Sequence, residues 1–435
     1  MKHDSPPVFL TVPADPAWVP VVQSVAETVA RIFRLDRTKG LRLAMGMEEV
    51  LLYLSQVVPG TPIKIEVGPD ATAVRAVFSL DAEALDLSAM NITASPSLAD
   101  ADGQNLPMLL ASRLSDGFSL TRSGRQILLT LFQEHVYPAV SPVETAPAPA
   151  RPPLRVERAR EASLIADACA RALGRFPGDR LPSWFSTPAR GVDLILAGRM
   201  HLLLLRDGGD AVCGLLCWQA ISGKSIVFSG PWLLSGDDAG AALLLEEMIN
   251  SLARGAAVSL VSDPEATPGN VDFAGHGFEL LATLPGRAVG QDAPADIPVW
   301  FRHLREDDGL NVWAHPDFAP FLEETYRRLF LIRTVQPVVE TGVTLTEPSV
   351  FAAALNKERR QATITPLLNG ADNRDNIAAH LNGLSQEGYE RIRFRIDLAE
   401  PWQAALGGEL VRQGCRPILV LPHAGRADVV VFQYV

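Results

Sequence analysis

The stretch LRLAMGMEEVLLYLSQVVPG, residues 41–60, decides the fold of the first part of the chain. Its apolar residues recur at the spacing of an amphipathic helix. Two adjacent carboxylates, Glu48 and Glu49, stand in the middle of this helix. Two glutamates alone are typical of a solvated helix turn, so a functional role has to come from the residues around them.

The segments on both sides of this helix predict an α+β sandwich with helices on one face of a mixed sheet. IKIEV (63–67) and AVRAVFSL (73–80) alternate apolar and polar residues with the period of a strand. Ser123-Gly124 predicts the turn of a hairpin near the end of this region. The other expected elements are a first strand at 9–14 and helices at 18–33 and 106–113.

Composition and charge indicate a large globular protein. The chain has 435 residues, of which 47% are hydrophobic and 20% are charged, which is enough for several domains. No apolar run reaches the roughly 18 residues of a membrane span, and the start, MKHDSPPVF, lacks the apolar core of a signal peptide. A formal charge of −11 argues against a nucleic-acid partner. We therefore expect a cytoplasmic protein with neither a membrane nor a nucleic-acid surface.

The four cysteines and eight histidines predict no disulfide and no metal site. Cys213 and Cys217 lie on an expected strand, where four residues separate two side chains by roughly 13 Å. That distance is too long for a disulfide or a shared metal ion, so buried free thiols in a reducing compartment are expected. No two histidines fall at metal-ligand spacing with a cysteine or carboxylate. We predict no metal ligands and assign no catalytic residue.

A proline-rich stretch divides the chain. PAVSPVETAPAPARPPL, residues 138–154, contains six prolines among seventeen residues and predicts an extended linker. Beyond it, strands and helices alternate in two segments, with strands expected at 192–197 and 201–206 and a helix at 239–254. The expected domains are 1–138, a linker at 139–153, 154–290 and 297–435.

The first domain resembles the anti-sigma-factor class of serine kinases, within the GHKL ATPase superfamily. The resemblance rests on the order of VPADPAWVPVVQSVAETVA (12–30), LRLAMGMEEVLLYL (41–54) and GQNLPMLLASRLSDGFSL (103–120). It implies an ATP site with magnesium, and a protein substrate or partner. By this resemblance Glu49 positions the attacking hydroxyl, Asp81 accepts the adenine amino group and Gly103 belongs to the phosphate lid.

The departures from that family's pattern argue against phosphoryl transfer. The resemblance implies an asparagine as magnesium ligand four residues after Glu49, where this chain has Tyr53, and a phenol is a poor magnesium ligand. Glu83 and Leu85 replace the two glycines of the adenine-site turn, and Asn105 replaces the second lid glycine. Glycine is what lets backbone amides approach phosphates closely. Three interpretations stay open: an active kinase, nucleotide binding without turnover, or an inherited fold used for partner contact.

The second segment resembles the GNAT acyltransferases. SGPWLLSGDDAGAALLLEEM, residues 229–248, fits that family's order of bulged strand, cofactor loop and helix. By this resemblance the strand pairs with the pantetheine arm of acetyl-CoA or acyl-CoA, and the loop and helix N-terminus hold its pyrophosphate. The resemblance implies that Leu234, Gly240 and Ala242 bind the cofactor. Asp237 stands in the slot of the family's Gln or Arg; it and the aspartate after it either repel a diphosphate or cap the helix.

The third segment resembles a GNAT half without the cofactor loop. EPWQAALGGELVRQGCRPILVLP, residues 400–422, matches the family's late helix and the strand after it. The ending ADVVVFQYV, with Asp428, Gln433 and Tyr434, resembles the close of bacterial proteins that fuse an anti-sigma-like ATPase domain to GNAT-like domains. This last resemblance spans nearly the whole chain and implies no known reaction.

The sequence therefore predicts an α+β GHKL-like domain followed by two mixed-sheet α/β GNAT-like domains. The expected function is that of a regulatory or ligand-sensing protein that acts through protein contacts, with a sigma factor or an anti-anti-sigma-like regulator as the partner class. ATP and acetyl-CoA or acyl-CoA are the candidate ligands. The alternative is an acyl-CoA-dependent N-acyltransferase that uses the 154–290 domain, so whether the chain is an enzyme stays open.

Overall fold

The computed structural model describes residues 6–95, 103–144, 148–235, 239–268, 271–286, 296–339 and 345–435. The chain divides into two compact units. The first unit contains residues 1–136 and 339–395 with Tyr434, and the second unit contains residues 137–338 and 396–433 with Val435. The chain thus leaves the first unit and later returns to it. The sequence predicted three consecutive domains, and their bounds stay a prediction.

The first unit begins with an antiparallel sheet. The strand order is β1 (Val8–Pro13), β2 (Pro62–Asp70), β3 (Ala73–Asp81), β5 (Gln126–Glu134) and β4 (Gly117–Ser123). All neighbours in it pair antiparallel, so the predicted mixed sheet is wrong here. The tight turns β2–β3 and β4–β5 force this direction, and the second of them confirms the hairpin predicted at Ser123-Gly124.

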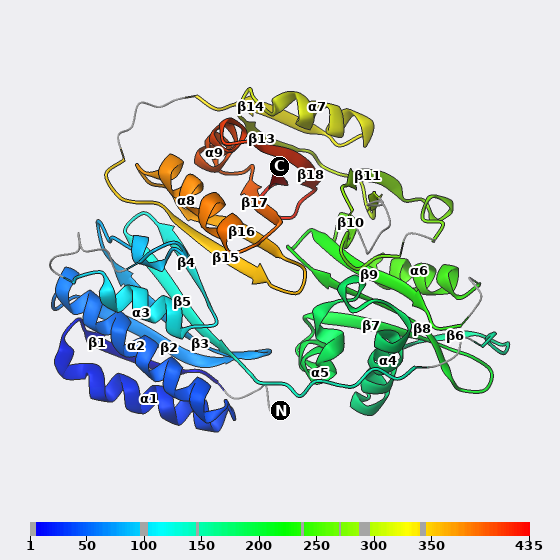
Figure 1. Ribbon diagram of the computed structural model, residues 1–435, viewed down its shortest axis with the longest axis horizontal. Coiled ribbons are helices and arrows are strands. Elements are labelled where there is room, and N and C mark those ends of the chain that lie inside the picture. Colours follow the sequence, from blue (N-terminus) through cyan, green and yellow to red (C-terminus); the bar gives the residue numbers. More distant parts are fainter. Residues whose placement is uncertain are drawn as a thin grey trace. The chain divides into compact units, whose positions relative to one another are not determined.

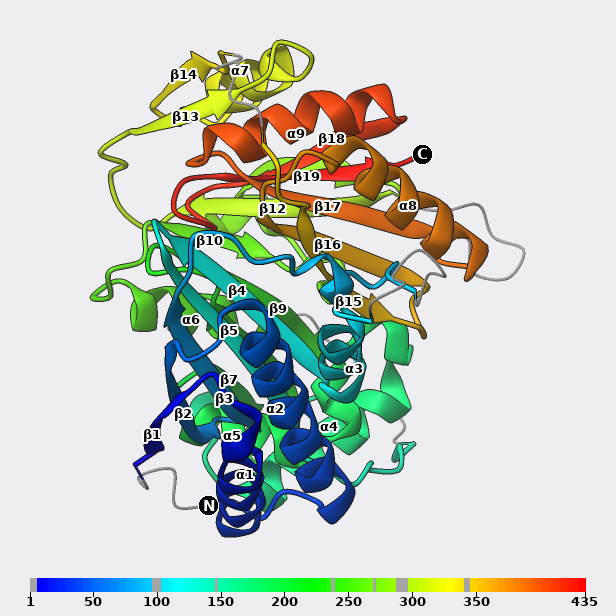
Figure 2. The same ribbon diagram turned by 90° about the vertical axis from the view of Figure 1, so that its left-hand side faces the viewer.

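Three helices lie on one face of this sheet: α1 (Val19–Ile32), α2 (Arg37–Val57) and α3 (Leu106–Leu114) (Figure 1, Figure 2). Helix α2 contains residues 41–57 of the stretch 41–60 and is capped by Asp36, whose carboxylate accepts the backbone N–H of Thr38 at 2.8 Å. Its buried stripe contributes Met47 and Leu54, each at most 2% exposed, to the core on the sheet. Burial of one such side chain stabilises the fold by about 1.5–3 kcal/mol. The two glutamates of α2 are left half-buried at the margin of this stripe.

Residues 345–395 add a second layer to the first unit. β15 (Val350–Asn356) and β16 (Gln361–Leu368) pair antiparallel, β16 and β17 (Arg391–Asp397) pair parallel, and α8 (Asn373–Gln386) connects the parallel pair. Asn91 joins the two layers: its side chain donates to the Ser349 carbonyl at 2.9 Å and accepts the Phe351 N–H at 2.8 Å. Val350 is fully buried in the core of the β1–β5 sheet. Part of the predicted third domain therefore shares a core with the first.

The second unit is built on a seven-stranded sheet. The strand order is β11 (Glu279–Leu284), β12 (Ile297–His303), β10 (Ser259–Ser262), β9 (Ser225–Leu233), β8 (Val212–Ala220), β7 (Met200–Arg206) and β6 (Arg155–Arg158). Neighbours pair antiparallel except β9 and β10, which are parallel. Residues 297–303, where the third domain was predicted to begin, form β12 inside this sheet.

Helices cover both faces of this sheet (Figure 1). α4 (Ala162–Arg175) and α5 (Pro188–Leu196) lie on one face and α6 (Ala239–Leu252) lies on the other. The alternation of MHLLLLR in β7 explains this, because Leu202 points to the core beneath α4 and Leu203 to the core beneath α6. The predicted strand at 192–197 is wrong: its apolar run belongs to α5, which Pro188 begins.

The later elements of the second unit are β13 (Leu310–Ala314), α7 (Ala319–Arg328), β14 (Arg333–Pro337), α9 (Pro401–Arg412), β18 (Cys415–Leu421) and β19 (Val429–Tyr434). β13 and β14 pair parallel. Short 3-10 helices are η1 (Pro16–Trp18), η2 (Ser88–Met90), η3 (Gly178–Arg180), η4 (Ser183–Ser186) and η5 (Ala274–His276).

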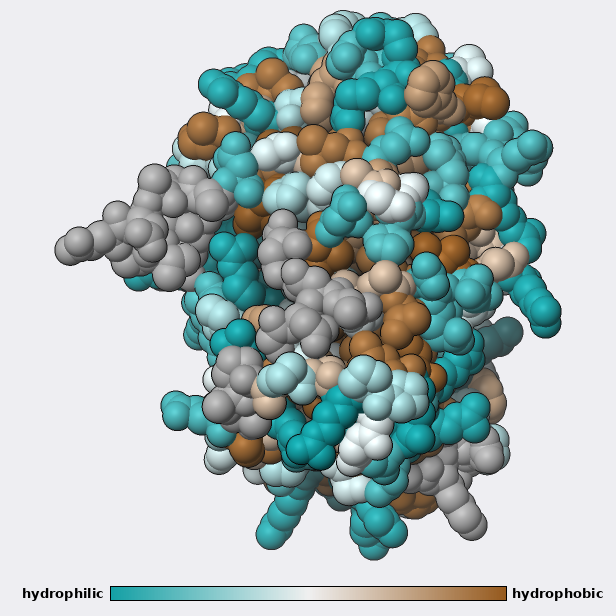
Figure 3. Space-filling model, turned by 90° about the vertical axis from the view of Figure 1, so that its right-hand side faces the viewer, coloured by the Kyte–Doolittle hydropathy of each residue, from teal (hydrophilic) through white to brown (hydrophobic). Residues whose placement is uncertain are grey.

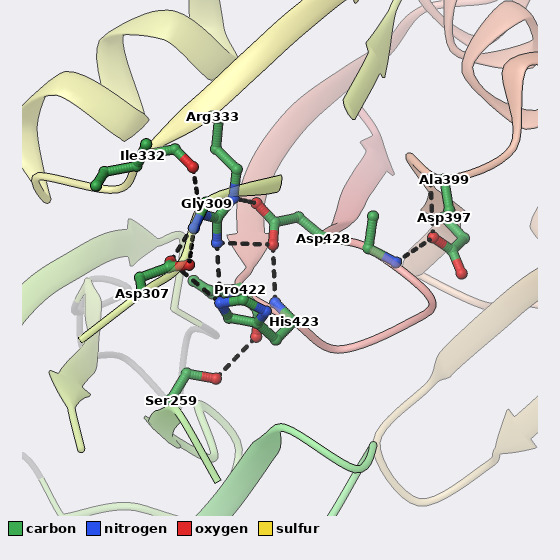
Figure 4. A network of polar contacts seen from close by, with 11 residues as sticks. Ser259, Asp307, Gly309, Ile332, Arg333, Asp397, Ala399, Pro422, His423 and Asp428 are labelled. Atoms are coloured by element: carbon green, nitrogen blue, oxygen red, sulfur yellow. Dashed lines mark hydrogen bonds and ion pairs between the residues drawn. The ribbon is translucent and has the colours of Figure 1, made fainter. Parts of the chain in front are cut away.

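A buried polar network ties these later elements together (Figure 4). The Arg333 guanidinium on β14 lies 2.7 Å from a carboxylate oxygen of Asp428 and 2.7 Å from one of Asp307. The backbone N–H of His423 donates to Asp428 at 2.8 Å, and its Nε2 lies 3.1 Å from Asp307. These four side chains are at most 4% exposed. The Arg333 guanidinium is therefore the shared counter-charge of two buried carboxylates, which also accept the N–H groups of Gly309 and His423.

The surface and the cysteines fit a globular protein. Hydrophobic residues on the face shown in Figure 3 are interspersed with hydrophilic ones. No helix among the described residues has the length and apolar character needed to cross a bilayer. All four cysteines are buried thiols, as expected.

Candidate functional site

A cavity of about 480 Å³ lies in the first unit between η2 and the start of α3. We call it the lid pocket, because it includes the predicted lid glycine, Gly103. Gly103 has a φ of +61°, a left-handed conformation that favours glycine. The described lining residues are Asp86, Ser88, Ala89, Asn91, Thr93, Ala94, Ser95, Gly103, Asn105, Leu106 and Leu109.

Asp86 organises the polar wall of the lid pocket. Its carboxylate accepts the backbone N–H of Ser88 at 3.0 Å, the Ser88 hydroxyl at 2.6 Å and the Asn105 amide at 3.1 Å. Asn105, which replaces the expected second lid glycine, thus holds the wall by its side chain. The sequence interpretation missed Asp86, although Asp-x-Ser is a local turn signal that could have marked it.

Tyr53 of α2 reaches the same wall from the core side. Its hydroxyl donates to the Asp86 carbonyl oxygen, and the side chain is 1% exposed. Burial, together with the nearby Asp86 carboxylate, raises the pKa of Tyr53 well above its ordinary value. The phenol therefore stays neutral, with its proton engaged, at the position where the ATPase resemblance implies a magnesium ligand.

Glu49, which the ATPase resemblance places at the nucleotide site, is not among the residues that line the lid pocket. Its side chain is half-buried. Burial and the neighbouring Glu48 raise the pKa of Glu49 above its usual value. Glu48 itself accepts a hydrogen bond from the Gln23 amide at 2.5 Å. Asp81 is exposed at the end of β3, where it pairs with Gln126. Of the three residues predicted to bind ATP, the structure places only the lid glycine at this pocket.

In the second unit, β9 has the bulge that the acyltransferase resemblance implies. Leu215 of β8 pairs with Trp232 and Cys217 pairs with Ser229, so β9 has one extra residue between these pairs. On its other side β9 pairs with β10 only as far as Phe228. The two parallel strands therefore separate at the bulge, where an extended ligand could add to the edge of β9.

This separation is filled by the protein's own chain. The Gly230 N–H, at the bulge, donates to the Ala266 carbonyl at 2.9 Å. Trp232 is 1% exposed and packs edge-on against Phe185 at a ring distance of 5.0 Å, and both belong to the same core as Ala266. A bound acyl group could take the Gly230 N–H only by displacing the turn at 263–266.

The predicted CoA residues are divided among different environments. The Leu234 N–H donates to the Cys213 carbonyl at 2.8 Å, so residue 234 extends the β8–β9 pairing. Gly240 packs against β7, since a Cβ there would lie 2.1 Å from Leu205 Cδ2. Ala242 is half-buried on α6. Asp237 lies outside the described residues. Within the described residues, no group of histidine, cysteine and acidic side chains is placed to hold a metal ion.

Comparison with known proteins gives structural neighbours only. No family model and no curated protein matches the chain. An N-acetyltransferase from Staphylococcus aureus is 15% identical over 35% of this chain and 99% of its own, with a TM-score of 0.29. A GNAT superfamily phosphinothricin acetyltransferase from Sinorhizobium meliloti in complex with AcCoA is 13% identical over 34% and 88%, with a TM-score of 0.28. Ard1 from Thermoplasma volcanium is 13% identical over 35% and 99%, with a TM-score of 0.27.

Proposed function

We propose that this chain is a regulatory protein that senses a ligand in the lid pocket and acts through protein contacts. One observation carries the proposal: the lid pocket has room for a small ligand, but the tyrosine behind it has its hydroxyl bonded to the Asp86 carbonyl. Phosphoryl transfer needs a metal ion to neutralise developing charge. A neutral, engaged phenol supplies no such ligand, so binding without turnover is the function that this pocket supports best.

The ligand class that we propose is an adenine nucleotide. The Asp86 carboxylate is the acceptor in the pocket wall that could take an exocyclic amino group, the role that the resemblance gave to Asp81. Gly103 brings backbone close to the pocket without a side chain.

The proposed output is a contact with a protein partner of the sigma-factor or anti-anti-sigma-like class. The described residues of α2 expose Leu41 and Met45, one helix turn apart, at 47% and 48%. Exposed apolar side chains in a row are the usual anchors of a protein contact. They belong to the helix whose Tyr53 touches the pocket wall, so ligand binding and partner contact share one element.

The test is a thermal-shift series on the full chain with ATP, ADP, acetyl-CoA and longer acyl-CoA, each with and without magnesium. We expect ATP and ADP to raise the melting temperature, and magnesium to produce no hydrolysis. Asp86→Asn should weaken nucleotide binding at least about tenfold, since a hydrogen bond to a charged group contributes about 1.5–3 kcal/mol. Asn105→Ala should weaken it less.

Asp81→Asn is the matched control, because this aspartate is exposed and away from the pocket. It should leave the nucleotide shift unchanged. Magnesium-dependent hydrolysis by the purified chain, or loss of binding in Asp81→Asn but not in Asp86→Asn, would contradict the proposal.

The bulged, separating strand β9 favours a second candidate, an acyl-CoA-dependent N-acyltransferase in the second unit. For this function acetyl-CoA or a longer acyl-CoA should raise the melting temperature, and an amine should be acylated. Ala242→Glu should abolish the shift. It is a cleaner test than a change at Gly240, which packs against Leu205. Absence of any shift at millimolar acyl-CoA would end this candidate.

A further inference from the structure

A second cavity, of about 320 Å³, lies in the second unit at the end of the β8–β9 pair. Arg151, Arg171 and Arg175 line it, and Asp207 is the acidic residue in its described lining. We call it the arginine pocket. It lies on the β8 side of β9, whereas the strand separation discussed above lies on the β10 side. Leu234 and Ser235, which directly precede the predicted cofactor loop in sequence, also line it. The position that the acyltransferase resemblance implies for the pantetheine arm is on the other side of β9.

The three arginines have spare hydrogen-bond donors. Arg171 uses its Nε in an ion pair with Asp167 at 2.9 Å, which leaves its two terminal nitrogens. Arg175, in the last turn of α4, has no side-chain partner among the described residues. Arg151 is exposed, and its backbone N–H rather than its side chain donates to Asp207. Planar guanidinium groups with free N–H pairs are suited to bidentate contact with phosphate oxygens.

The acidic residue does not cancel this charge. The Asp207 carboxylate accepts the N–H groups of Ala211 and Gly209 at 2.9 Å and that of Arg151 at 3.2 Å. Those hydrogen bonds, with the Ala211 bond the largest cause, lower the pKa of Asp207. Asp207 therefore stays ionised and is held in the β7–β8 turn by neutral N–H groups, and one carboxylate faces three guanidinium groups in the described lining.

A buried hydroxyl points to a ligand independently of the arginines. Ser235 lines the same cavity and is 7% exposed, and its Oγ has no hydrogen-bond partner among the described residues. Its backbone N–H donates to the Cys213 carbonyl, which fixes the residue at the end of the strand pair. A buried hydroxyl normally has a partner, because its desolvation is otherwise uncompensated. An anionic oxygen in the cavity would provide it.

We propose that the arginine pocket binds the phosphate monoester of a small phosphorylated metabolite. Arg171 and Arg175 would chelate the phosphate oxygens, the Ser235 hydroxyl would donate to one of them, and Arg151 would close the site. The cavity volume suits a small metabolite and not an extended cofactor.

The arginine pocket includes Arg151 of the predicted linker, so a bound ligand would contact the linker directly. The carbonyl of Arg151 accepts the Gly208 N–H at 2.5 Å, and the Val143 N–H donates to the Ala170 carbonyl at 2.9 Å. Residues 143 and 151 thus both lie along the second unit. A ligand that contacts both Arg151 and α4 would hold the linker against the second unit. Ligand binding would in this way restrict the motion of the linker. This inference does not rest on the lid pocket.

The test is calorimetric titration of the full chain with inorganic phosphate and with ribose 5-phosphate, a monoester probe without an adenine base. We expect binding that weakens as salt is raised, and as the pH falls from 7.5 to 5, because a monoester loses its second charge near pH 6. Arg171→Gln/Arg175→Gln should weaken binding at least about tenfold, and Ser235→Ala about three- to tenfold. Ser235→Ala should keep the melting temperature of the free chain, since no partner is lost.

Arg254→Gln, a change of an exposed arginine after α6, is the matched control and should leave affinity unchanged. Asp86→Asn in the lid pocket should alter neither phosphate nor ribose 5-phosphate binding, so the two sites can fail separately. The proposal is overturned if phosphate and ribose 5-phosphate do not bind at millimolar concentration, or if the arginine double variant binds them like the wild type. Binding of coenzyme A without binding of ribose 5-phosphate would overturn it too, by making the pocket part of an acyl-donor site.

Discussion

Tyr53 connects the stretch 41–60 with the wall of the lid pocket. The residue sits at the spacing from Glu49 that the resemblance gives to a metal ligand. The structure adds that its ring is buried and its hydroxyl is bonded to the Asp86 carbonyl. That neutral hydrogen bond holds one wall of the lid pocket to α2.

Tyr53→Phe should destabilise the first unit by about 0.5–1.5 kcal/mol. The change removes one hydrogen bond and keeps the ring, so the loss is that of a single neutral bond. Chemical unfolding followed by circular dichroism would measure it. Leu52 is half-buried on the same helix. Leu52→Ala therefore tests whether any substitution on α2 lowers the free energy of unfolding by a similar amount. An unchanged free energy of unfolding in Tyr53→Phe would mean that the hydrogen bond to Asp86 does not stabilise the first unit.

Glu49 gives a pH dependence whose sign can be worked out. Its folded-state pKa is raised above the usual 4.5, chiefly by burial and then by Glu48. The ionised carboxylate is therefore disfavoured in the folded protein. This cost is absent below pH 4.5, grows as the pH rises through the raised folded value, and is constant above it. Glu49→Gln removes the cost.

We expect Glu49→Gln to be more stable than the wild type at pH 7 and equal to it at pH 4. The difference should stay below about 1 kcal/mol, because the group is partly exposed and solvent screens it. Unfolding curves at both pH values would show it. Glu27→Gln, an exposed change on α1, should show no such difference. A loss of stability at pH 7 in Glu49→Gln would give the carboxylate a stabilising partner instead.

Residue types identified parts of the site, but tertiary contacts decided which residues line it. Gly103, which the resemblance gives to a phosphate lid, lines a cavity, and its role in binding stays a prediction. Asp81 was predicted and Asp86 was not. The two aspartates stand five residues apart in one polar stretch, and only the end of β3 at Asp81 separates their environments. The Asp-x-Ser signal marks a turn at Asp86, but which of the two aspartates lines a cavity depends on contacts with distant segments such as α2 and α3.

At the scale of elements, α6 and β7 are held at close approach by a glycine. The Cβ position of Gly240 is 2.1 Å from Leu205 Cδ2. Gly240→Ala should therefore destabilise the second unit by about 1–3 kcal/mol through overpacking. Leu205→Val in the same chain should recover part of this loss, so the double variant should cost less than the sum of the single ones.

Denaturant unfolding of the four chains gives that coupling energy. Gly178→Ala is the control, because nothing lies within 4 Å of its Cβ position, and its effect should stay within about 0.5 kcal/mol. If the stability losses of the two single variants add in the double variant, residues 240 and 205 are not in steric conflict.

The spacing of apolar residues predicted most elements. It failed where the same short apolar run fits either a strand or a helix. The helices at 41–60 and 239–254 and the hairpin at Ser123-Gly124 were recognisable from apolar spacing and turn residues. The run at 192–197 was not, because a short apolar run fits a buried strand and a packed helix equally well. Here the face beneath α4 had to be covered, and α5 covers it.

At the scale of the whole molecule, each unit is assembled from distant segments of the chain. The first unit takes back residues 339–395, and the second takes residues 396–433. Such a return depends on single contacts, such as that of Asn91 with residue 351, that carry no local signal. The sequence could therefore suggest the kinds of layer, and not which segments share a core.

The Arg333 network is where this long-range assembly of the second unit can be tested. Arg333 lies between Asp307 and Asp428, which are far apart in sequence, and all three side chains are almost fully buried (Figure 4). Removing the cation leaves two carboxylates without a counter-charge, an arrangement that costs far more than the pair itself contributes.

Arg333→Met should lower the free energy of unfolding by about 3–5 kcal/mol. Arg333→Met combined with Asp307→Asn and Asp428→Asn should recover part of that loss, because the uncompensated charges are gone. Urea unfolding monitored by tryptophan fluorescence measures both. Arg426→Gln is the control: its ion pair with Glu400 is exposed on the arginine side, so its loss should cost below about 1 kcal/mol. If the triple variant is no more stable than Arg333→Met, the cation acts by packing and not by compensating the two buried carboxylates.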